Sequence, residues 1–279
     1  MSRLGTIRLK LESFLVSRFL TYGEDDFLAV LRGLGVGKGD ALMVHSSYRK
    51  NNGFLGRPVD MCRLLMEVVG PTGLLVMPSM AYTDSSKKYL MRGKPMNVRF
   101  TPSHMGLLSE VFRRNRDSVR SLSATHPLVA WGELVDQFVA GHERAVVPFG
   151  EGSPFEKLYE RGAKILCIDT GFESITFTHF VEDRIRDRIG VPLYEEDIYT
   201  GMVIDTEGRQ IVVPTRVISD QAREARCEER YIRVLERRGE ISRRRIGNTR
   251  LLLVNCKAMV AAAERMYREG DYFFSPPQQ

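Results

Sequence analysis

The sequence lacks the long apolar stretch that a membrane-spanning helix needs. Its 279 residues contain no uninterrupted apolar run of about 18 residues, so no membrane span is predicted. Charged side chains at Arg8, Lys10, Glu12 and Arg18 also break up the N-terminus, which makes a signal peptide a poor interpretation. Hydrophobic residues at 43% and charged residues at 27% are ordinary for a globular protein and exclude the disordered and fibrous classes.

Cysteine is scarce and scattered. The four cysteines include no CxxC pair, so neither a disulfide framework nor a zinc knuckle is expected. No other spacing of histidine, cysteine and acidic residues predicts a metal site. We interpret Cys62, Cys167, Cys227 and Cys256 as small buried hydrophobic residues, for which a reducing cytoplasm is the best fit.

The charge balance is positive, with 41 lysines and arginines against 35 aspartates and glutamates. Part of the excess lies between Arg113 and Arg120, and part lies in a late run from Arg237 to Arg245. Such charge suits an anionic partner, either nucleic acid or a phosphate-bearing cofactor such as coenzyme A. No helix-turn-helix or RNA-binding signature accompanies it, so we predict no nucleic-acid partner and interpret the late run mainly as a solvated face.

The N-terminal segment 1–23 has the pattern of an amphipathic helix. Its apolar residues near one face are Leu11, Phe14, Leu15, Phe19 and Leu20. This face is predicted to pack on the rest of the chain or on a partner subunit, and a homodimer is the default expectation.

The remaining residues, 24–275, predict one domain. Short apolar runs alternate with helical periods, and no linker or repeat divides them; the predicted strands are 41–47, 74–80, 127–132 and 163–171, and the predicted helices include 24–35, 58–69, 105–115 and 176–188. Two alternating runs within 199–217 flank a turn. The expected fold is therefore α/β, with a central mostly parallel sheet flanked by helices and a late antiparallel β insertion.

Candidate binding residues follow the predicted strands. His45, Ser46 and Ser47 end the first strand, where ligands of open α/β sheets bind, although small polar residues can also simply finish a strand. Val119, Arg120 and Ser121 follow a basic helix, and arginine beside serine can hold a phosphate or an amide, although spacing alone favours a surface arginine.

A glycine-rich loop opens another predicted helix. Phe149, Gly150, Gly152 and Ser153 lead into Pro154, with the serine as the predicted N-cap. The loop matches neither a P-loop nor a dinucleotide fingerprint, and by itself it is a weak signal for an anion site.

The most informative segment is the helix that carries His179 and Glu182. Residues three apart share a helix face, so the histidine can act as a general base that the glutamate orients. An exposed ion pair is the simpler alternative from spacing alone. His126, just before a strand, is either a second polar group in the same cleft or a buried structural histidine, and His142 is interpreted as an unimportant loop residue.

Taken in order, six segments resemble the aminoglycoside 3-N-acetyltransferase family, which has the antibiotic N-acetyltransferase fold. They are GDALMVHSS (39–47), VVGPTGLLVMPS (68–79), TPSHMGLLSEVFRR (101–114), VRSLSATHPLVAWG (119–132), FGEGSPFEKL (149–158) and TFTHFVE (176–182). The resemblance implies an acetyl-CoA-dependent N-acetyltransferase that uses no metal.

The resemblance also implies roles for individual residues. It implies His179 as the general base, Glu182 as its companion and His126 near the reaction centre. The residues that it implies for binding coenzyme A are His45, Ser46, Ser47, Val119, Arg120, Ser121, Phe149, Gly150, Gly152 and Ser153.

Several positions depart from the family pattern. Ser123 stands in place of the first histidine of the Arg-Ser-x-His-Pro-Thr-His-Ser run, Pro127 in place of its last serine, and Ile175 in place of an asparagine. Only one acidic cluster, 195–197, is available to attract a polycation. We therefore favour an amino sugar over an aminoglycoside drug as acceptor, and a different acyl group, a hydroxyl acceptor and a non-catalytic member remain alternatives.

Overall fold

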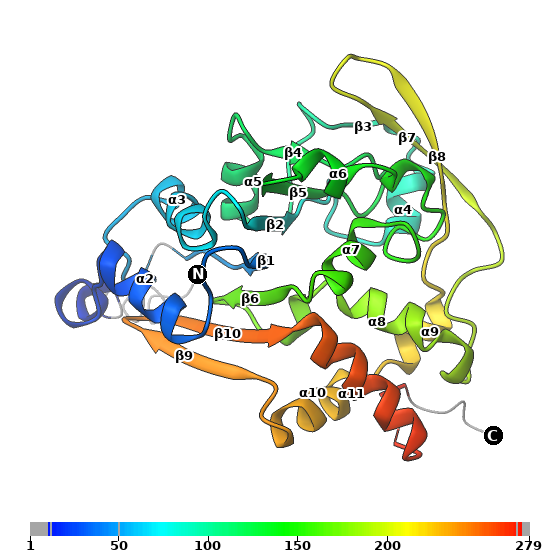
Figure 1. Ribbon diagram of the computed structural model, residues 1–279. Coiled ribbons are helices and arrows are strands. Elements are labelled where there is room, and N and C mark those ends of the chain that lie inside the picture. Colours follow the sequence, from blue (N-terminus) through cyan, green and yellow to red (C-terminus); the bar gives the residue numbers. More distant parts are fainter. Residues whose placement is uncertain (1–10, 12, 50, 272, 275–279) are drawn as a thin grey trace.

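The computed structural model describes residues 11, 13–49, 51–271 and 273–274 (Figure 1). The α-helices are α2 (Glu24–Gly33), α3 (Pro58–Val69), α4 (Ser86–Met91), α5 (Leu107–Arg113), α6 (Val135–Val139), α7 (Pro154–Glu160), α8 (Thr178–Arg184), α9 (Asp220–Ala225), α10 (Glu228–Arg237) and α11 (Cys256–Arg268). Short 3₁₀ turns occur at His142–Arg144, Phe172–Ser174 and Arg186–Arg188.

A seven-stranded sheet with the order β4-β5-β2-β1-β6-β10-β9 forms the centre. Its strands are β1 (Ala41–Ser46), β2 (Leu74–Pro78), β4 (Val119–Arg120), β5 (Leu128–Gly132), β6 (Lys164–Ile168), β9 (Ser242–Ile246) and β10 (Thr249–Asn255). The α/β class is confirmed, but the expectation of a mostly parallel sheet is wrong. Among the described strands of this sheet, only β2, β1 and β6 run parallel, and the outer strands pair antiparallel.

Helices cover both faces of this sheet, because alternate strand residues point to opposite sides. Met43 of β1 packs in the core cluster that holds residues of α7, α8, α10 and α11. Its neighbours Leu42 and Val44 pack in the second cluster, with residues of α2, α3 and α5. Because both faces are covered, the sequences of the central strands are continuous apolar runs. The carboxyl ends of β1 and β6 lie side by side, since Ser46 pairs with Ile168.

Local signals set several helix boundaries as the sequence predicts. Pro58 stands at the first turn of α3, and Asp60 accepts a hydrogen bond from the Arg57 N–H at 2.8 Å. Gly70, with φ of 67°, follows the last residue of that helix. Ser153 caps α7, where its hydroxyl accepts from the Glu156 N–H.

The late insertion is an antiparallel hairpin of β7 (Tyr199–Ile204) and β8 (Gln210–Thr215), as predicted. It gains a third strand, β3 (Met96–Asn97), which pairs parallel with β7. In Figure 1 this small sheet projects at the side opposite β9 and β10.

Part of the predicted N-terminal helix lies outside the described residues, since 1–10 and 12 are not described. Residues 13–19 are helical. Val16 is buried, whereas Phe14, Leu15 and Phe19, which the sequence predicts to pack, are exposed. The apolar face of this segment is therefore not covered by the described residues.

Candidate functional site

A histidine and a buried carboxylate contact each other on α8. The ring nitrogen Nδ1 of His179 lies 3.0 Å from Oε2 of Glu182, whose side chain is fully buried. Arg226, just after α9, pairs with the same carboxylate at 2.6 and 2.9 Å. The sequence-predicted pair is thus in contact, and the structure adds an arginine to it.

The contact with Glu182 determines which ring nitrogen of His179 carries the proton. A carboxylate only accepts hydrogen bonds, so His179 donates from Nδ1 and keeps Nε2 as its basic nitrogen. Burial by itself would raise the pKa of Glu182, but the charges and hydrogen bonds of His179 and Arg226 bring that pKa below its usual value. Glu182 is therefore an anion that can stabilise a positive imidazole ring.

His126 and His179 meet at a cavity of about 260 Å³. Their rings lie 5.9 Å apart, edge to face, and Phe149 lies 5.2 Å from each of them. Burial, together with the neighbouring His179, holds the pKa of His126 well below its usual value, so this ring is neutral. The complete lining is Met80, Tyr82, Thr83, Asp84, Ser85, Ser86, Met105, His126, Thr176, His179, Ile218, Arg223 and Arg226.

Several buried polar atoms near the carboxyl ends of the central strands have no hydrogen-bond partner. They are Nε2 of His45 and the hydroxyl of Ser46 in β1, the hydroxyl of Ser79 after β2, and the hydroxyl of Thr176, which precedes α8 and lines the cavity. Burial lowers the pKa of His45 to about 3, so its ring is neutral and can donate or accept one further hydrogen bond. Buried polar atoms without partners are rare in folded proteins, so those of His45, Ser46 and Ser79, at the ends of two neighbouring strands, are available to a ligand.

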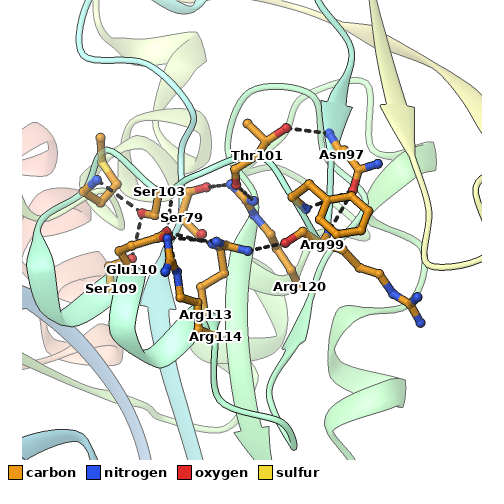
Figure 2. Close-up of polar contacts among 12 residues, drawn as sticks. Ser79, Asn97, Arg99, Thr101, Ser103, Ser109, Glu110, Arg113, Arg114 and Arg120 are labelled. Carbon is orange, nitrogen blue, oxygen red and sulfur yellow. Dashed lines mark hydrogen bonds and ion pairs between the residues drawn. The ribbon is translucent and has the colours of Figure 1, made fainter. Parts of the chain in front are cut away.

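Arg120 takes a different position from the one that its sequence context indicates. Figure 2 shows its guanidinium between Thr101 and Ser79, and it donates to the backbone carbonyls of both, at 2.6 Å to Thr101. Its side chain is buried, and burial lowers its pKa to about 10. Val119 precedes it in the short strand β4. In this position Arg120 fixes the segments after β2 and before α5.

Ser121 and the glycine-rich loop form hydrogen bonds inside the protein. Ser121 accepts from the Leu128 N–H at 2.9 Å and lies 2.7 Å from Nδ1 of His142. His142 Nε2 donates to the Pro148 carbonyl at 2.6 Å. The expectation that His142 is an unimportant loop residue is wrong, since it is fully buried and links Ser121 to the segment that presents Phe149.

The loop that follows Phe149 is tied to α7 and packs against α8. Ser153 donates to the Gly150 carbonyl at 2.6 Å, and Gly152 adopts a φ of 73°. A Cβ at Gly150 would lie 3.1 Å from a carboxylate oxygen of Asp183, so the loop approaches α8 closely.

Comparison with known proteins decides the family. The sequence profile of the aminoglycoside 3-N-acetyltransferase family matches residues 43–268. The chain belongs to this family. Members of this family are acetyltransferases, so this protein is a coenzyme A-dependent acyltransferase.

Among relatives in this acetyltransferase family, the SPbeta prophage-derived aminoglycoside N(3')-acetyltransferase-like protein YokD of Bacillus subtilis is 30% identical over 65% of this chain and 70% of its own length. Aminoglycoside N(3)-acetyltransferase IV of a Salmonella species is 26% identical over 91% of this chain and 90% of its own.

Solved acetyltransferase structures share the fold. YokD from Bacillus subtilis superposes with a TM-score of 0.74 at 23% identity, covering 91% of this chain and 96% of that chain. AAC-IIIb in a binary complex with CoASH superposes with a TM-score of 0.73 at 21% identity, covering 93% of this chain and 100% of that chain.

Two kinds of feature are absent from the residues that the structure describes. No group of three or more histidine, cysteine or acidic side chains is arranged to hold a metal ion. No helix in those residues combines the length and hydropathy needed to cross a membrane.

Proposed function

We propose that this protein transfers an acetyl group from acetyl-CoA to an amine of an aminoglycoside-like or amino-sugar acceptor. The observation that carries the proposal is the His179–Glu182 contact in the wall of a cavity, next to unpaired polar groups at the strand ends. An amine acceptor, a thioester donor and a general base are the three components that such a transfer needs.

The base is His179 acting through Nε2. A sugar amine is largely protonated near neutral pH and attacks a thioester only as the neutral amine. The ammonium first releases one proton to solvent. His179 takes a second proton from the attacking nitrogen as the carbon–nitrogen bond forms, and the coenzyme A thiolate leaves with the carbon–sulfur bond pair and can receive that second proton. General-base catalysis of this kind contributes about 10²–10⁴ in rate.

The unpaired strand-end atoms support the placement of the donor. The pantetheine arm carries amides that need hydrogen-bond partners, and His45 and Ser46 offer a ring nitrogen and a hydroxyl without partners. The Ser46 hydroxyl and the neutral ring of His126 are candidate donors to the negative oxygen of the tetrahedral intermediate. Phe149 contacts the rings of both histidines, and hydrogen bonds of Ser121 to His142 and of Ser153 to the Gly150 carbonyl hold the segments around it.

The charges around the histidine cavity favour an acceptor with little positive charge. Its wall carries one carboxylate, Asp84, which is paired with Arg92, and two arginines, Arg223 and Arg226, which are paired with Asp220 and Glu182. The acidic cluster of the sequence is also occupied or exposed, since Glu195 binds Lys87 at 2.8 Å and residues 196 and 197 face solvent. A polycationic aminoglycoside prefers an acidic pocket, so the balance favours an amino sugar.

A thiol-release assay with acetyl-CoA tests the proposal. The acceptors are an aminoglycoside with several amines, free glucosamine and a nucleotide-linked glucosamine, each with product identification by mass spectrometry. We expect faster turnover with the amino sugars. Efficient acetylation of the aminoglycoside with none of the amino sugars would overturn the acceptor choice, and no thiol release with any acceptor would count against the transferase.

We further propose a cytoplasmic homodimer without a nucleic-acid partner. The four cysteines are free thiols, which supports a reducing compartment, and exposed Phe14 and Phe19 supply apolar surface for a second subunit. Light scattering of the purified chain tests the dimer, and a monomer at micromolar concentration would contradict it.

A further inference from the structure

His142 is a fully buried histidine that does not line the histidine cavity. It begins the short 3₁₀ turn that lies between α6 and α7. Its two ring nitrogens contact two different segments of the chain. Nε2 lies 2.6 Å from the carbonyl of Pro148, and Nδ1 lies 2.7 Å from the hydroxyl of Ser121. A polar ring is costly to bury unless its nitrogens have partners, so these two contacts stabilise the position of the ring.

The partners of His142 determine which of its nitrogens carries the proton. A carbonyl oxygen only accepts hydrogen bonds, so Nε2 donates to Pro148. Burial lowers the pKa of His142 to about 4, so the ring is neutral near neutral pH and its Nδ1 is an acceptor. The Ser121 hydroxyl therefore donates to Nδ1, while its oxygen accepts from the Leu128 N–H at 2.9 Å. Each hydrogen bond from Leu128 to Pro148 thus has a single direction.

The contact with Ser121 holds the loop that carries His126. Ser121 and Leu128 flank this loop, and their backbones also pair, since the Ser121 N–H donates to the Leu128 carbonyl at 2.8 Å. Within the loop, the His126 N–H donates to the Ser123 hydroxyl at 3.1 Å. His142 is therefore bonded to the base of the loop that presents His126 to the cavity.

The contact with Pro148 holds the segment that carries Phe149. Pro148 directly precedes Phe149, and the Phe149 ring lies 5.2 Å from the rings of both His126 and His179. Phe149 is buried, so its ring is packed against these neighbours. Because protein interiors are close-packed, a shift of Pro148 would move the Phe149 ring and with it the two histidines.

From these contacts we infer that His142 is a positioning residue for acetyl transfer. It sets how the His126 loop and the Phe149 segment lie against each other, and it acts on the ring of His179 through them. The inference rests on the proposed function, because it takes His179 as the base. Geometry at a base affects the rate strongly, since a misplacement of about 1 Å can cost about a hundredfold.

Substitutions that remove one or both contacts test this role in the thiol-release assay. His142→Phe keeps a ring and removes both nitrogens, whereas His142→Gln keeps a donor that can reach the Pro148 carbonyl. We expect kcat to fall by roughly tenfold to a hundredfold in His142→Phe and by roughly threefold to tenfold in His142→Gln. The KM for acetyl-CoA and the affinity for coenzyme A should match those of wild type, because the base is displaced while the donor's own contacts remain.

Tyr231→Phe is the matched control for the loss of a buried hydrogen bond. Tyr231 is also fully buried, and its hydroxyl donates to the Met259 carbonyl at 2.6 Å, the same length as the bond from His142 to Pro148. Tyr231 does not line the cavity. The control should therefore lose stability and keep the wild-type kcat per folded molecule, with the folded fraction measured by circular dichroism.

Nitrogen-15 spectra of the five histidine rings provide a readout that needs no turnover. In wild type, His142 should be neutral with its proton on Nε2. His142→Phe and His142→Gln should move the ring signals of His126 and His179, and Tyr231→Phe should leave them in place. A wild-type His142 ring with its proton on Nδ1 would contradict the hydrogen bonds on which the inference depends.

The remaining outcomes separate the inference from the proposed function. Wild-type kcat in the folded His142 variants, or a fall that Tyr231→Phe shares, would overturn the inference and leave the transferase intact. A loss confined to coenzyme A affinity would also overturn it, because the role of His142 would then lie in donor binding. Absence of thiol release by wild type with every acceptor would count against the proposed function, whereas the ring signals would still show whether His142 positions both histidines.

Discussion

Replacing Glu182 by glutamine tests how the buried carboxylate stabilises a positive charge on the His179 ring. The carboxylate oxygen lies 3.0 Å from Nδ1, and at an effective dielectric constant of about 20 a charge pair at that distance gains about 5–6 kcal/mol. Arg226 opposes this gain. Its Nη2 lies 2.9 Å from the same oxygen, so it stands within about 6 Å of the ring and repels it by about 3 kcal/mol.

The attraction by Glu182 and the repulsion by Arg226 together predict that the double variant is faster than the single variant. Glu182→Gln removes the attraction and leaves the repulsion, so kcat should fall by up to about 10⁴. The double variant Glu182→Gln/Arg226→Met removes both charges and should lose only their difference, about 3 kcal/mol or roughly a hundredfold. The second substitution should therefore restore activity by about a hundredfold.

Steady-state thiol release at saturating donor measures kcat for wild type, single and double variants, with circular dichroism to correct for unfolded protein. That control matters because removing one partner of a buried ion pair costs about 3–5 kcal/mol of folding stability. A double variant as slow as the single variant, at equal folded fraction, would refute the electrostatic reasoning.

Three further outcomes follow from single features of the structure. Burial lowers the pKa of His45 to about 3 and of His142 to about 4, so between pH 6.5 and 4 only the unfolded chain binds these protons. The unfolding free energy should therefore fall by about 1.4 kcal/mol per pH unit for each histidine as pH drops through that window. Urea titrations of His142→Gln should show a weaker dependence of this free energy on pH than wild type, and an equal dependence would mean that the His142 ring is exposed. Gly106→Ala should destabilise the fold by about 1–3 kcal/mol, because φ is 102° and the new Cβ would lie 2.7 Å from the Ser46 carbonyl; an unchanged melting temperature would contradict this. Arg120→Met should cost about 2–4 kcal/mol by leaving two carbonyls unpaired, whereas the exposed Arg114→Met should cost under about 1 kcal/mol, and equal losses in urea titration would disprove the buried role.

Local signals made much of the fold predictable. Pro58 and Gly70 bracket α3, and Ser153 with Pro154 begins α7, because caps and turn residues act within a few positions of the chain. The strand direction was not predictable in this way. β5 and β10 have apolar residues on both faces, so their sequence pattern resembles that of parallel strands although both pair antiparallel.

In the candidate site, too, contacts between residues close in the sequence were predictable and contacts between distant residues were not. His179 and Glu182 are three residues apart, so helix geometry alone places them in contact. Arg226 lies 44 residues after Glu182, and no local spacing indicates that it pairs with that carboxylate. His142 was missed for a similar reason, since its partners Ser121 and Pro148 meet only when β4 and the loop before α7 fold together.

Turnover of His179→Asn against wild type, with acetyl-CoA and whichever acceptor supports activity, tests the role of His179. We predict a loss of about 10²–10⁴ in kcat with unchanged coenzyme A affinity, because the base is lost while the donor site stays intact. Wild-type turnover in that variant would contradict the assignment of His179 as the general base.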